Sequence, residues 1–132
     1  MGSSSRFVVV CLGGAAGTGA RYLLATGALR WLGPSFPYGT LCVNLLGSFL
    51  LGAVMELAVL GHLDPDVRVV LATGVMGGFT TYSSFNQETL GYLGRGAWWL
   101  GGAYLTGTVA GCLVAGALGL AAARWLATGQ GV

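Results

Sequence analysis

Four long apolar blocks, separated by short polar turns, constrain the fold of this chain more than any other feature. A helix that crosses the hydrocarbon core of a bilayer needs roughly 20 apolar residues. The blocks reach this length, and they cover about residues 6–32, 38–60, 67–93 and 97–125. We therefore expect an all-α membrane protein with four transmembrane helices, folded as one integral-membrane domain over residues 1–132.

The scarcity of charged side chains supports the same expectation. Only 8% of the 132 residues are charged and 55% are hydrophobic, whereas a soluble domain carries about 25% charged residues. A net charge of +2 without clustered Lys and Arg also excludes a nucleic-acid-binding surface. The chain leaves no room for a soluble enzyme domain beside the membrane part.

The arginines are divided almost evenly between the two ends of the predicted helices. Arg6, Arg68 and Arg124 belong to one end, and Arg30 and Arg95 belong to the other; the numbers are equal if Arg21 is counted with the second group. Cytoplasmic loops of membrane proteins are enriched in Lys and Arg, and this asymmetry sets their orientation. Because the asymmetry here is small, we expect insertion in both orientations, which permits an antiparallel pair of chains.

Small residues recur every fourth position in two of the blocks. Gly13 and Gly17 do so in the first block, and the fourth block carries the series Ala103, Gly107, Gly111, Ala115 and Gly119. Such spacing lets helix backbones approach closely in a membrane. The contacts predicted here are either within one chain or with a second chain.

Polar side chains follow one face of the second and fourth helices. Residues four apart share a helix face, and the two series are Thr40, Asn44 and Ser48, and Tyr104, Thr108 and Cys112. Hydrogen bonds between helices would explain the hydroxyl groups. An Asn amide needs several partners, which favours a polar pathway through the membrane instead.

The third block contains a cluster of glycines directly before two threonines. Gly74, Gly77 and Gly78 precede Thr80 and Thr81, and each Gly inside a helix costs about 0.5–1 kcal/mol relative to Ala. We therefore expect a helix broken at about residues 76–81. A break frees backbone groups, and it is tolerated where protein or a cavity covers them. Free carbonyls can hold a cation, and a helix N-terminus favours an anion.

The polar positions as a set are better suited to an anion than to a cation. They supply amide and hydroxyl donors, and no acidic residue lies at mid-membrane in the first, second or fourth block. Aromatic ring edges carry partial positive charge. Arg21, late in the first block, either extends to the interface or attracts anions to a pore mouth, and Glu56, near a span end, is expected to be solvated.

At these positions the sequence resembles the Fluc (CrcB) fluoride channel family. The resemblance covers nearly the whole chain, and the motifs that carry it are GGAAGTGARY at 13–22, YGTLCVNLLGSFLLG at 38–52, TGVMGGFTTYSSFNQE at 73–88, and Tyr104 with Thr108 and Cys112. It implies passive fluoride efflux through two pores of an antiparallel homodimer in a prokaryotic cell membrane. It implies no enzymatic activity and no organic cofactor.

The resemblance also implies roles for single residues. A structural Na⁺ would be held by the backbone carbonyls of Gly77 and Thr80 from both chains, Arg21 would lie in a vestibule, and Glu88 near the pore. The implied fluoride pore residues are Thr40, Asn44, Tyr82, Ser83, Phe85, Tyr104, Thr108 and Cys112. Two of them depart from the family pattern, since Phe is usual at position 82 and a hydroxyl residue is common at position 112.

Three alternatives to the homodimeric channel stay open from the sequence. Some family members work as heterodimers of two similar chains. Because Tyr82 departs from the usual Phe, a heterodimer stays an alternative for this chain. A small dual-topology multidrug or cation transporter would depend on Glu88, the deep carboxylate of the third block. A non-transporting packing subunit would use the polar stripes only as contacts between helices.

Overall fold

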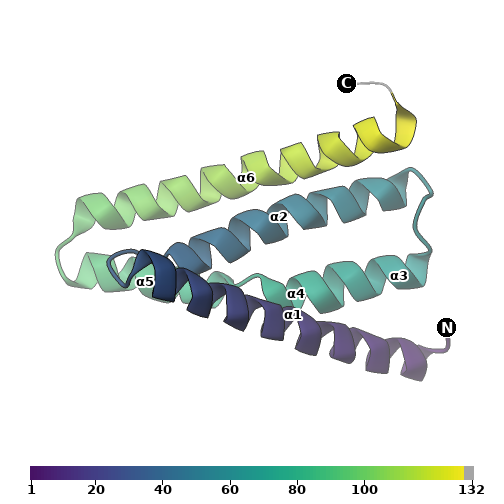
Figure 1. Ribbon diagram of the computed structural model, residues 1–132, viewed down its shortest axis with the longest axis horizontal. Helices are drawn as coiled ribbons and strands as arrows, with labels where there is room; N and C mark the ends of the chain where they lie inside the picture. The colour runs from purple at the N-terminus through teal and green to yellow at the C-terminus, as the bar shows by residue number, and fades with distance from the viewer. Residues whose placement is uncertain (130–132) are drawn as a thin grey trace.

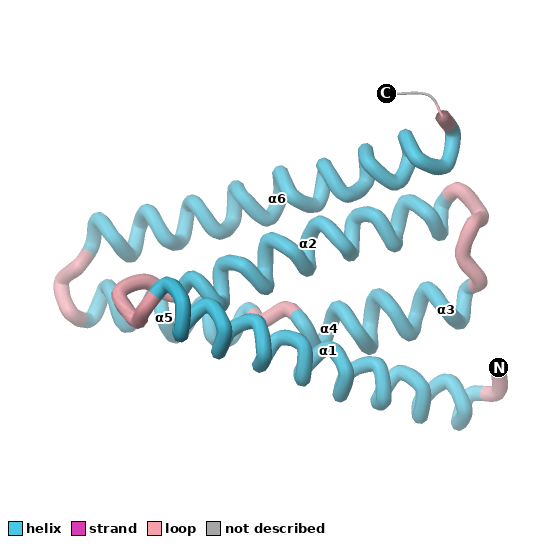
Figure 2. Tube along the Cα trace, viewed as in Figure 1, coloured by secondary structure: helices cyan, strands magenta, loops and turns pink. Residues whose placement is uncertain are grey.

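The computed structural model describes residues 1–129, and these residues form helices joined by short turns, with no strand (Figures 1 and 2). The elements are α1 (Ser3–Leu32), α2 (Tyr38–Val59), α3 (Pro65–Val69), the π-helical stretch η1 (Val70–Met76), α4 (Gly77–Phe79), α5 (Tyr82–Gly94) and α6 (Trp98–Thr128). The expectation of an all-α chain is confirmed. Residues 130–132 of the predicted domain lie outside the described residues.

The elements compose four crossings of the bundle. The helices α1, α2 and α6 are each long and apolar enough to span a membrane. The third crossing is divided into pieces, from α3 through η1 and α4 to α5, and it runs beside α1 for its first half (Figure 1). Its outer bounds, Pro65 and Gly94, lie within a few residues of the predicted block.

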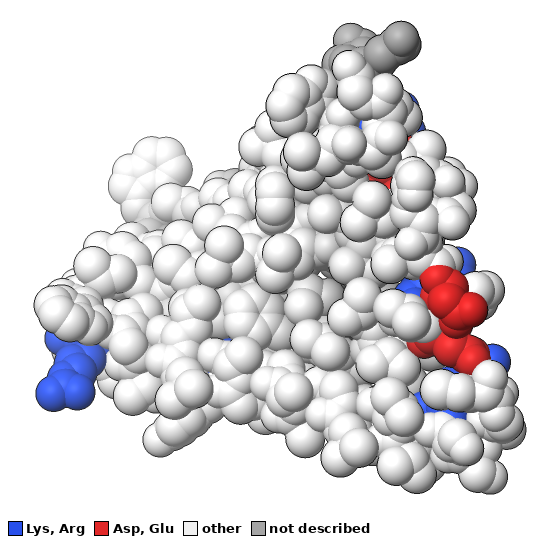
Figure 3. Space-filling model, turned by 45° about the vertical axis from the view of Figure 1, so that its right-hand side comes forward, with Lys and Arg blue, Asp and Glu red and all other residues white. Residues whose placement is uncertain are grey.

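Charged side chains are concentrated at one end of the bundle. The N-terminus, the α2–α3 turn and the end of α6 all lie at this end (Figure 1). Acidic and basic residues gather on this end of the surface (Figure 3). Arg6 forms an ion pair with Asp66, and the Asp64 side chain caps α3 by accepting the Asp66 N–H at 2.8 Å. The turn at the other end follows Arg30, and Arg95 lies in the second turn there.

Close approach of helix backbones explains several of the regularly spaced glycines. A Cβ at Gly119 of α6 would lie 1.9 Å from the carbonyl oxygen of Phe49 in α2. A Cβ at Gly17 of α1 would lie 2.0 Å from the carbonyl oxygen of Val75. Gly107 differs, because a Cβ there would meet nothing within 4 Å. At Gly17 and Gly119 the small residues therefore serve contacts within the chain.

The position of Glu56 contradicts the sequence-based expectation of a solvated side chain. Glu56 is 3% exposed, and the Nε of Arg124 donates to its Oε1 at 2.7 Å. The α2 and α6 helices pack along their length, and Arg124 on α6 therefore reaches the carboxylate. The pair places a compensated charge inside the helix interface, where an isolated carboxylate would be strongly disfavoured.

Candidate functional site

The third crossing is interrupted at Thr80 and Thr81. Both residues have extended backbone, with φ −81° and ψ 158° at Thr80 and φ −148° and ψ 109° at Thr81. Thr81 is also the N-cap of α5, because its hydroxyl oxygen accepts the Ser84 N–H at 3.3 Å. The break is two residues long and lies at the C-terminal end of the expected range.

The glycines before the break are not the residues that leave the helical conformation. Gly77 and Gly78 form the helical turn α4. A Cβ at Gly78 would lie 2.3 Å from the carbonyl oxygen of Gly14, and a Cβ at Gly74 would lie 2.7 Å from that of Val10. Gly74 and Gly78 therefore let α1 pack against the third crossing, and the physical cause of the break must be sought elsewhere.

The side chain of Asn44 binds both backbone groups of Thr81. Its Nδ2 donates to the Thr81 carbonyl at 3.0 Å, and the Thr81 N–H donates to its Oδ1 at 2.8 Å. Both residues are buried. Asn44 thus acts on Thr81 as a facing peptide group would, and it satisfies buried backbone groups that the break removes from the helix.

Two carbonyl groups lose their usual helical donors at the break. In a continuous α-helix the carbonyl of Gly77 would accept the Thr81 N–H, which here donates to Asn44. The carbonyl of Thr80 would accept the Ser84 N–H, which here donates to the Thr81 hydroxyl. The predicted cation ligands, the carbonyls of Gly77 and Thr80, are therefore released from helical pairing.

An open groove of about 410 Å³ runs beside the break. Five predicted pore residues line it, namely Asn44, Tyr82, Phe85, Thr108 and Cys112. The rings of Tyr82 and Phe85 meet edge to face with centroids 5.9 Å apart. Phe85 is 5% exposed and Tyr82 is 78% exposed, so one ring belongs to the core of the chain and the other projects from it.

Thr108 carries an unsatisfied donor in this groove. Its hydroxyl oxygen is buried and has no hydrogen-bond partner among the described residues. Leaving a buried polar group unpaired costs about 1–3 kcal/mol. The oxygen atom itself is covered, so an ion in the groove could accept this hydrogen bond, and offset the cost, only after neighbouring side chains move.

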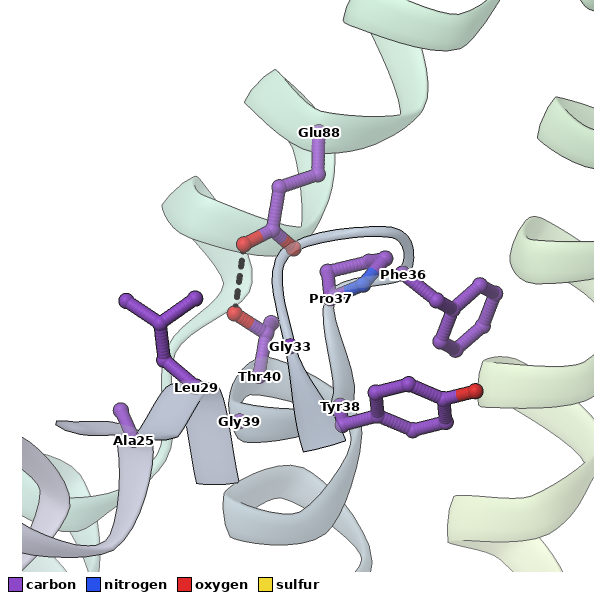
Figure 4. A pocket seen from close by; sticks show the side chains of 9 residues that line it. All are labelled: Ala25, Leu29, Gly33, Phe36, Pro37, Tyr38, Gly39, Thr40 and Glu88. Carbon is purple, nitrogen blue, oxygen red and sulfur yellow. Dashed lines mark hydrogen bonds between the residues drawn. The ribbon is translucent and has the colours of Figure 1, made fainter. Parts of the chain in front are cut away.

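The Glu88 carboxylate, on α5, accepts hydrogen bonds from two other predicted pore residues. The Thr40 hydroxyl donates to its Oε1 and the Tyr104 hydroxyl donates to its Oε2, each at 2.7 Å. Figure 4 shows Glu88 and Thr40 facing a cavity of about 160 Å³ under the α1–α2 turn. Thr40, Tyr104 and Glu88 do not line the groove beside the break.

Arg21 and Ser83 line a third hollow, of about 460 Å³. Thr40 and Thr81 also line it, so Thr40 lies between this hollow and the Glu88 cavity. Within one chain the predicted site residues therefore fall into two neighbouring sets. Arg21, Thr40, Ser83, Tyr104 and Glu88 form the first, here called the Arg21 set, and the groove residues form the second. The two sets are in contact, because the ring centroids of Phe85 and Tyr104 lie 5.3 Å apart.

Three features of this site are absent from the sequence-based predictions. They are the hydrogen bonds between Asn44 and Thr81, the sharing of Glu88 by Thr40 and Tyr104, and the cap that Thr81 forms on α5. The cap could have been found, because Thr81 directly before a helix is a common N-cap. The other contacts join residues from different helices, whose spatial relation the sequence does not state.

Comparison with known proteins places the chain among relatives over nearly its full length. The model of the family described as "CrcB-like protein, Camphor Resistance (CrcB)" matches residues 8–120. The "Fluoride-specific ion channel FluC" of Anaeromyxobacter sp. (strain K) is 54% identical over 124 residues, which cover 93% of this chain and 98% of the relative. The protein of the same name from Sorangium cellulosum (strain So ce56) is 52% identical over 125 residues, covering 94% and 98%.

Proposed function

The chain belongs to the CrcB family, and from this membership and the geometry of its groove we propose that it is a fluoride-selective channel. It is a membrane channel and not an enzyme. The single observation that carries the proposal is the similarity over nearly the whole chain to relatives named as fluoride-specific channels. Acting passively in a prokaryotic cell membrane, the channel would drain fluoride from the cell.

The chemistry of the groove supports an anion as the permeating species. The Thr108 hydroxyl has no partner among the described residues, and Asn44 uses one of its two amide N–H groups on Thr81. The edges of aromatic rings carry partial positive charge, and Tyr82 and Phe85 line the groove. Fluoride must exchange its water for such donors, and several weak sites in series let it leave again.

The same groove argues against the cation transporter. That alternative depends on Glu88, whose carboxylate accepts hydrogen bonds from Thr40 and Tyr104. Glu88 is not among the residues that line the groove. Because the Glu88 carboxylate accepts these two hydrogen bonds, it interacts with residues of the Arg21 set rather than with a cation beside the break.

An antiparallel homodimer with two pores is the assembly that fits this chain. The face of α5 that carries Tyr82, Ser83, Asn86 and Gln87 is exposed, and exposed polar groups in hydrocarbon are costly. A second copy, inserted in the opposite orientation, would cover this face and close the open side of the groove. It would also bring the Arg21 set of one chain near the groove of the other.

A structural Na⁺ fits the free carbonyl groups at the break. Unwound backbone carbonyls are typical Na⁺ ligands in membrane proteins, and the carbonyls of Gly77 and Thr80 lack their helical donors. A Cβ at Gly77 would meet nothing within 4 Å, so this face is open to the same two carbonyls of a second copy. When bound, the ion would hold the two broken helices together.

Fluoride efflux from liposomes tests the proposal directly. Purified protein is reconstituted with internal KF, and a fluoride electrode records efflux after valinomycin is added. We expect efflux well above that of empty liposomes, and no comparable efflux of chloride. Absence of fluoride efflux from a folded, dimeric sample would reject the homodimeric channel, whereas efflux only after co-reconstitution with a similar chain would establish the heterodimer.

A further inference from the structure

We propose that Asn44 is a positioning residue that holds the third crossing open at Thr81. Its amide satisfies the donor and the acceptor of the same residue, at 2.8 and 3.0 Å. If Asn44 released the Thr81 N–H, this group could pair with the Gly77 carbonyl and extend the helix by one residue. The break is therefore maintained by a side chain of α2 and not by the glycines of the third crossing.

The packing of α2 against the break supports this role. A Cβ at Gly47, which lies on the turn after Asn44, would come 2.2 Å from the Thr80 side-chain methyl group. The absence of a side chain at Gly47 thus lets α2 lie close enough for the short Asn44 side chain to reach the backbone. Asp cannot replace Asn44, because a carboxylate oxygen would face the Thr81 carbonyl where Nδ2 now donates.

One amide consequently connects two parts of the site. On one side it frees the Gly77 carbonyl, and on the other it lines the groove beside Thr108 and Phe85. The hydrogen bonds to Thr81 also fix the plane of the amide, and with it the direction of the second N–H. The proposed effect of Asn44 on cation binding rests on the Na⁺ site proposed above. The proposed effect of Asn44 on the backbone at Thr81 does not depend on that site.

Hydrogen exchange tests the backbone claim without reference to transport. Exchange is followed by mass spectrometry on peptides that contain residues 79–85, in wild type, Asn44→Leu, Asn44→Asp and Thr108→Val. Asn44→Leu removes the acceptor of the Thr81 N–H, and loss of this buried hydrogen bond predicts roughly tenfold faster exchange. Asn44→Asp keeps an oxygen that can accept from this N–H and loses only the donor to the Thr81 carbonyl, so a smaller increase is expected. Thr108→Val is the matched control, because it alters the groove without touching Thr81, and it should exchange as wild type does. Unchanged exchange in Asn44→Leu would overturn the proposal.

A second measurement distinguishes positioning from general stability. The midpoint of thermal unfolding is compared in NaCl and in N-methyl-D-glucamine chloride. A variant that is merely destabilised has an equally lower unfolding midpoint in both salts. Misplaced carbonyls at Gly77 and Thr80 instead reduce the increase in midpoint that Na⁺ produces. We expect this reduction in Asn44→Asp and not in Thr108→Val. A full Na⁺-dependent increase in Asn44→Asp would contradict the proposal.

The outcomes also separate this inference from the proposed channel function. If wild type transports no fluoride but Asn44→Leu still exchanges faster than wild type, the proposed channel function is rejected and the positioning role of Asn44 stands. If the Asn44 variants do not fold, the exchange rate of the Thr81 N–H in wild type tests the proposal by itself. The Thr81 N–H lies outside any helix, yet it must exchange as slowly as the interior amides of α5, and fast exchange would reject the role of Asn44.

Discussion

Thr108 shows how a single hydroxyl can be unfavourable for packing and useful for conduction. Because its buried oxygen has no partner among the described residues, Thr108→Val should keep the fold or stabilise it by up to about 1–3 kcal/mol. A hydrogen bond to an ion contributes about 1.5–3 kcal/mol. We therefore expect fluoride efflux to fall by roughly tenfold or more, measured in liposomes alongside the unfolding midpoint.

Thr106→Val is the control for this prediction. Thr106 lies on the same helix, is exposed, and donates to the Gly102 carbonyl of its own helix at 2.8 Å. Its replacement should leave efflux unchanged. Equal losses of efflux in the Thr106 and Thr108 variants would show that removing any hydroxyl from α6 impairs transport. The Thr108 hydroxyl would then have no specific role in the groove.

Tyr82 is the residue at which this chain departs from the ring usual in the family. No hydrogen bond of its hydroxyl occurs among the described residues, and the side chain is 78% exposed. We therefore expect Tyr82→Phe to keep the rate of fluoride efflux within about twofold, since it preserves the ring edge. Phe85→Ala, which removes the buried ring of the pair, should lose most efflux. A large change in Tyr82→Phe would assign the hydroxyl to the pore.

At the scale of the helices, glycine spacing has different meanings at different positions. Gly119→Ala should destabilise the chain, because its Cβ would lie 1.9 Å from a backbone oxygen of α2 and overpacking costs about 1–3 kcal/mol. Gly107→Ala, on the same helix, meets open space in the chain and should be neutral in the monomer. Thermal unfolding in detergent compares the two.

The Gly107 variant also reports on the dimer. If a second copy packs against this part of α6, Gly107→Ala should reduce the dimer fraction in size-exclusion chromatography while the fold of the chain is kept. Equal unfolding midpoints for the Gly119 and Gly107 variants would show that the close contact between α2 and α6 relaxes without cost.

The sequence predicts the helices well because length and apolar character decide them. The bounds of α1, α2 and α6 follow from blocks that a bilayer would accept. The break is only located approximately, because Gly74 and Gly78 are explained by contact with α1 and the interruption depends on Asn44, 37 positions away from Thr81. A residue on a neighbouring helix overrides the local preference of the third crossing, and no local pattern reports it.

The arrangement of the candidate site residues does not follow from the sequence. Periodicity placed Thr40 and Asn44 on one face of α2, but it did not identify their partners in the third crossing, which are Glu88 for Thr40 and Thr81 for Asn44. Glu56 illustrates the same limit, since only the packing of α6 on α2 brings Arg124 to it. Residue identity gives the available donors, whereas the pairing of helices determines where each donor is used.

At the scale of the whole molecule, the distribution of arginines should control orientation in the membrane. Arg30 and Arg95 are exposed at the end opposite to Arg6, Arg68 and Arg124. Replacing Arg30 and Arg95 with Gln leaves three arginines at one end and only Arg21, within α1, towards the other. The end rich in Arg favours the cytoplasm. We expect one orientation to dominate, measured by protease access to a C-terminal tag in membrane vesicles.

The functional consequence follows from the antiparallel assembly. Chains that all insert in one orientation cannot pair antiparallel, so fluoride efflux from cells that express the double Gln variant should fall, even though each chain folds. The double Lys variant keeps both charges and should retain mixed orientation and efflux. Co-expression with a variant in which Arg6 and Arg68 are Gln, biased the opposite way, should restore efflux. Arg124 is kept in this variant because it compensates the buried Glu56 carboxylate. Full efflux from the double Gln variant alone, with a single orientation confirmed, would exclude an antiparallel channel.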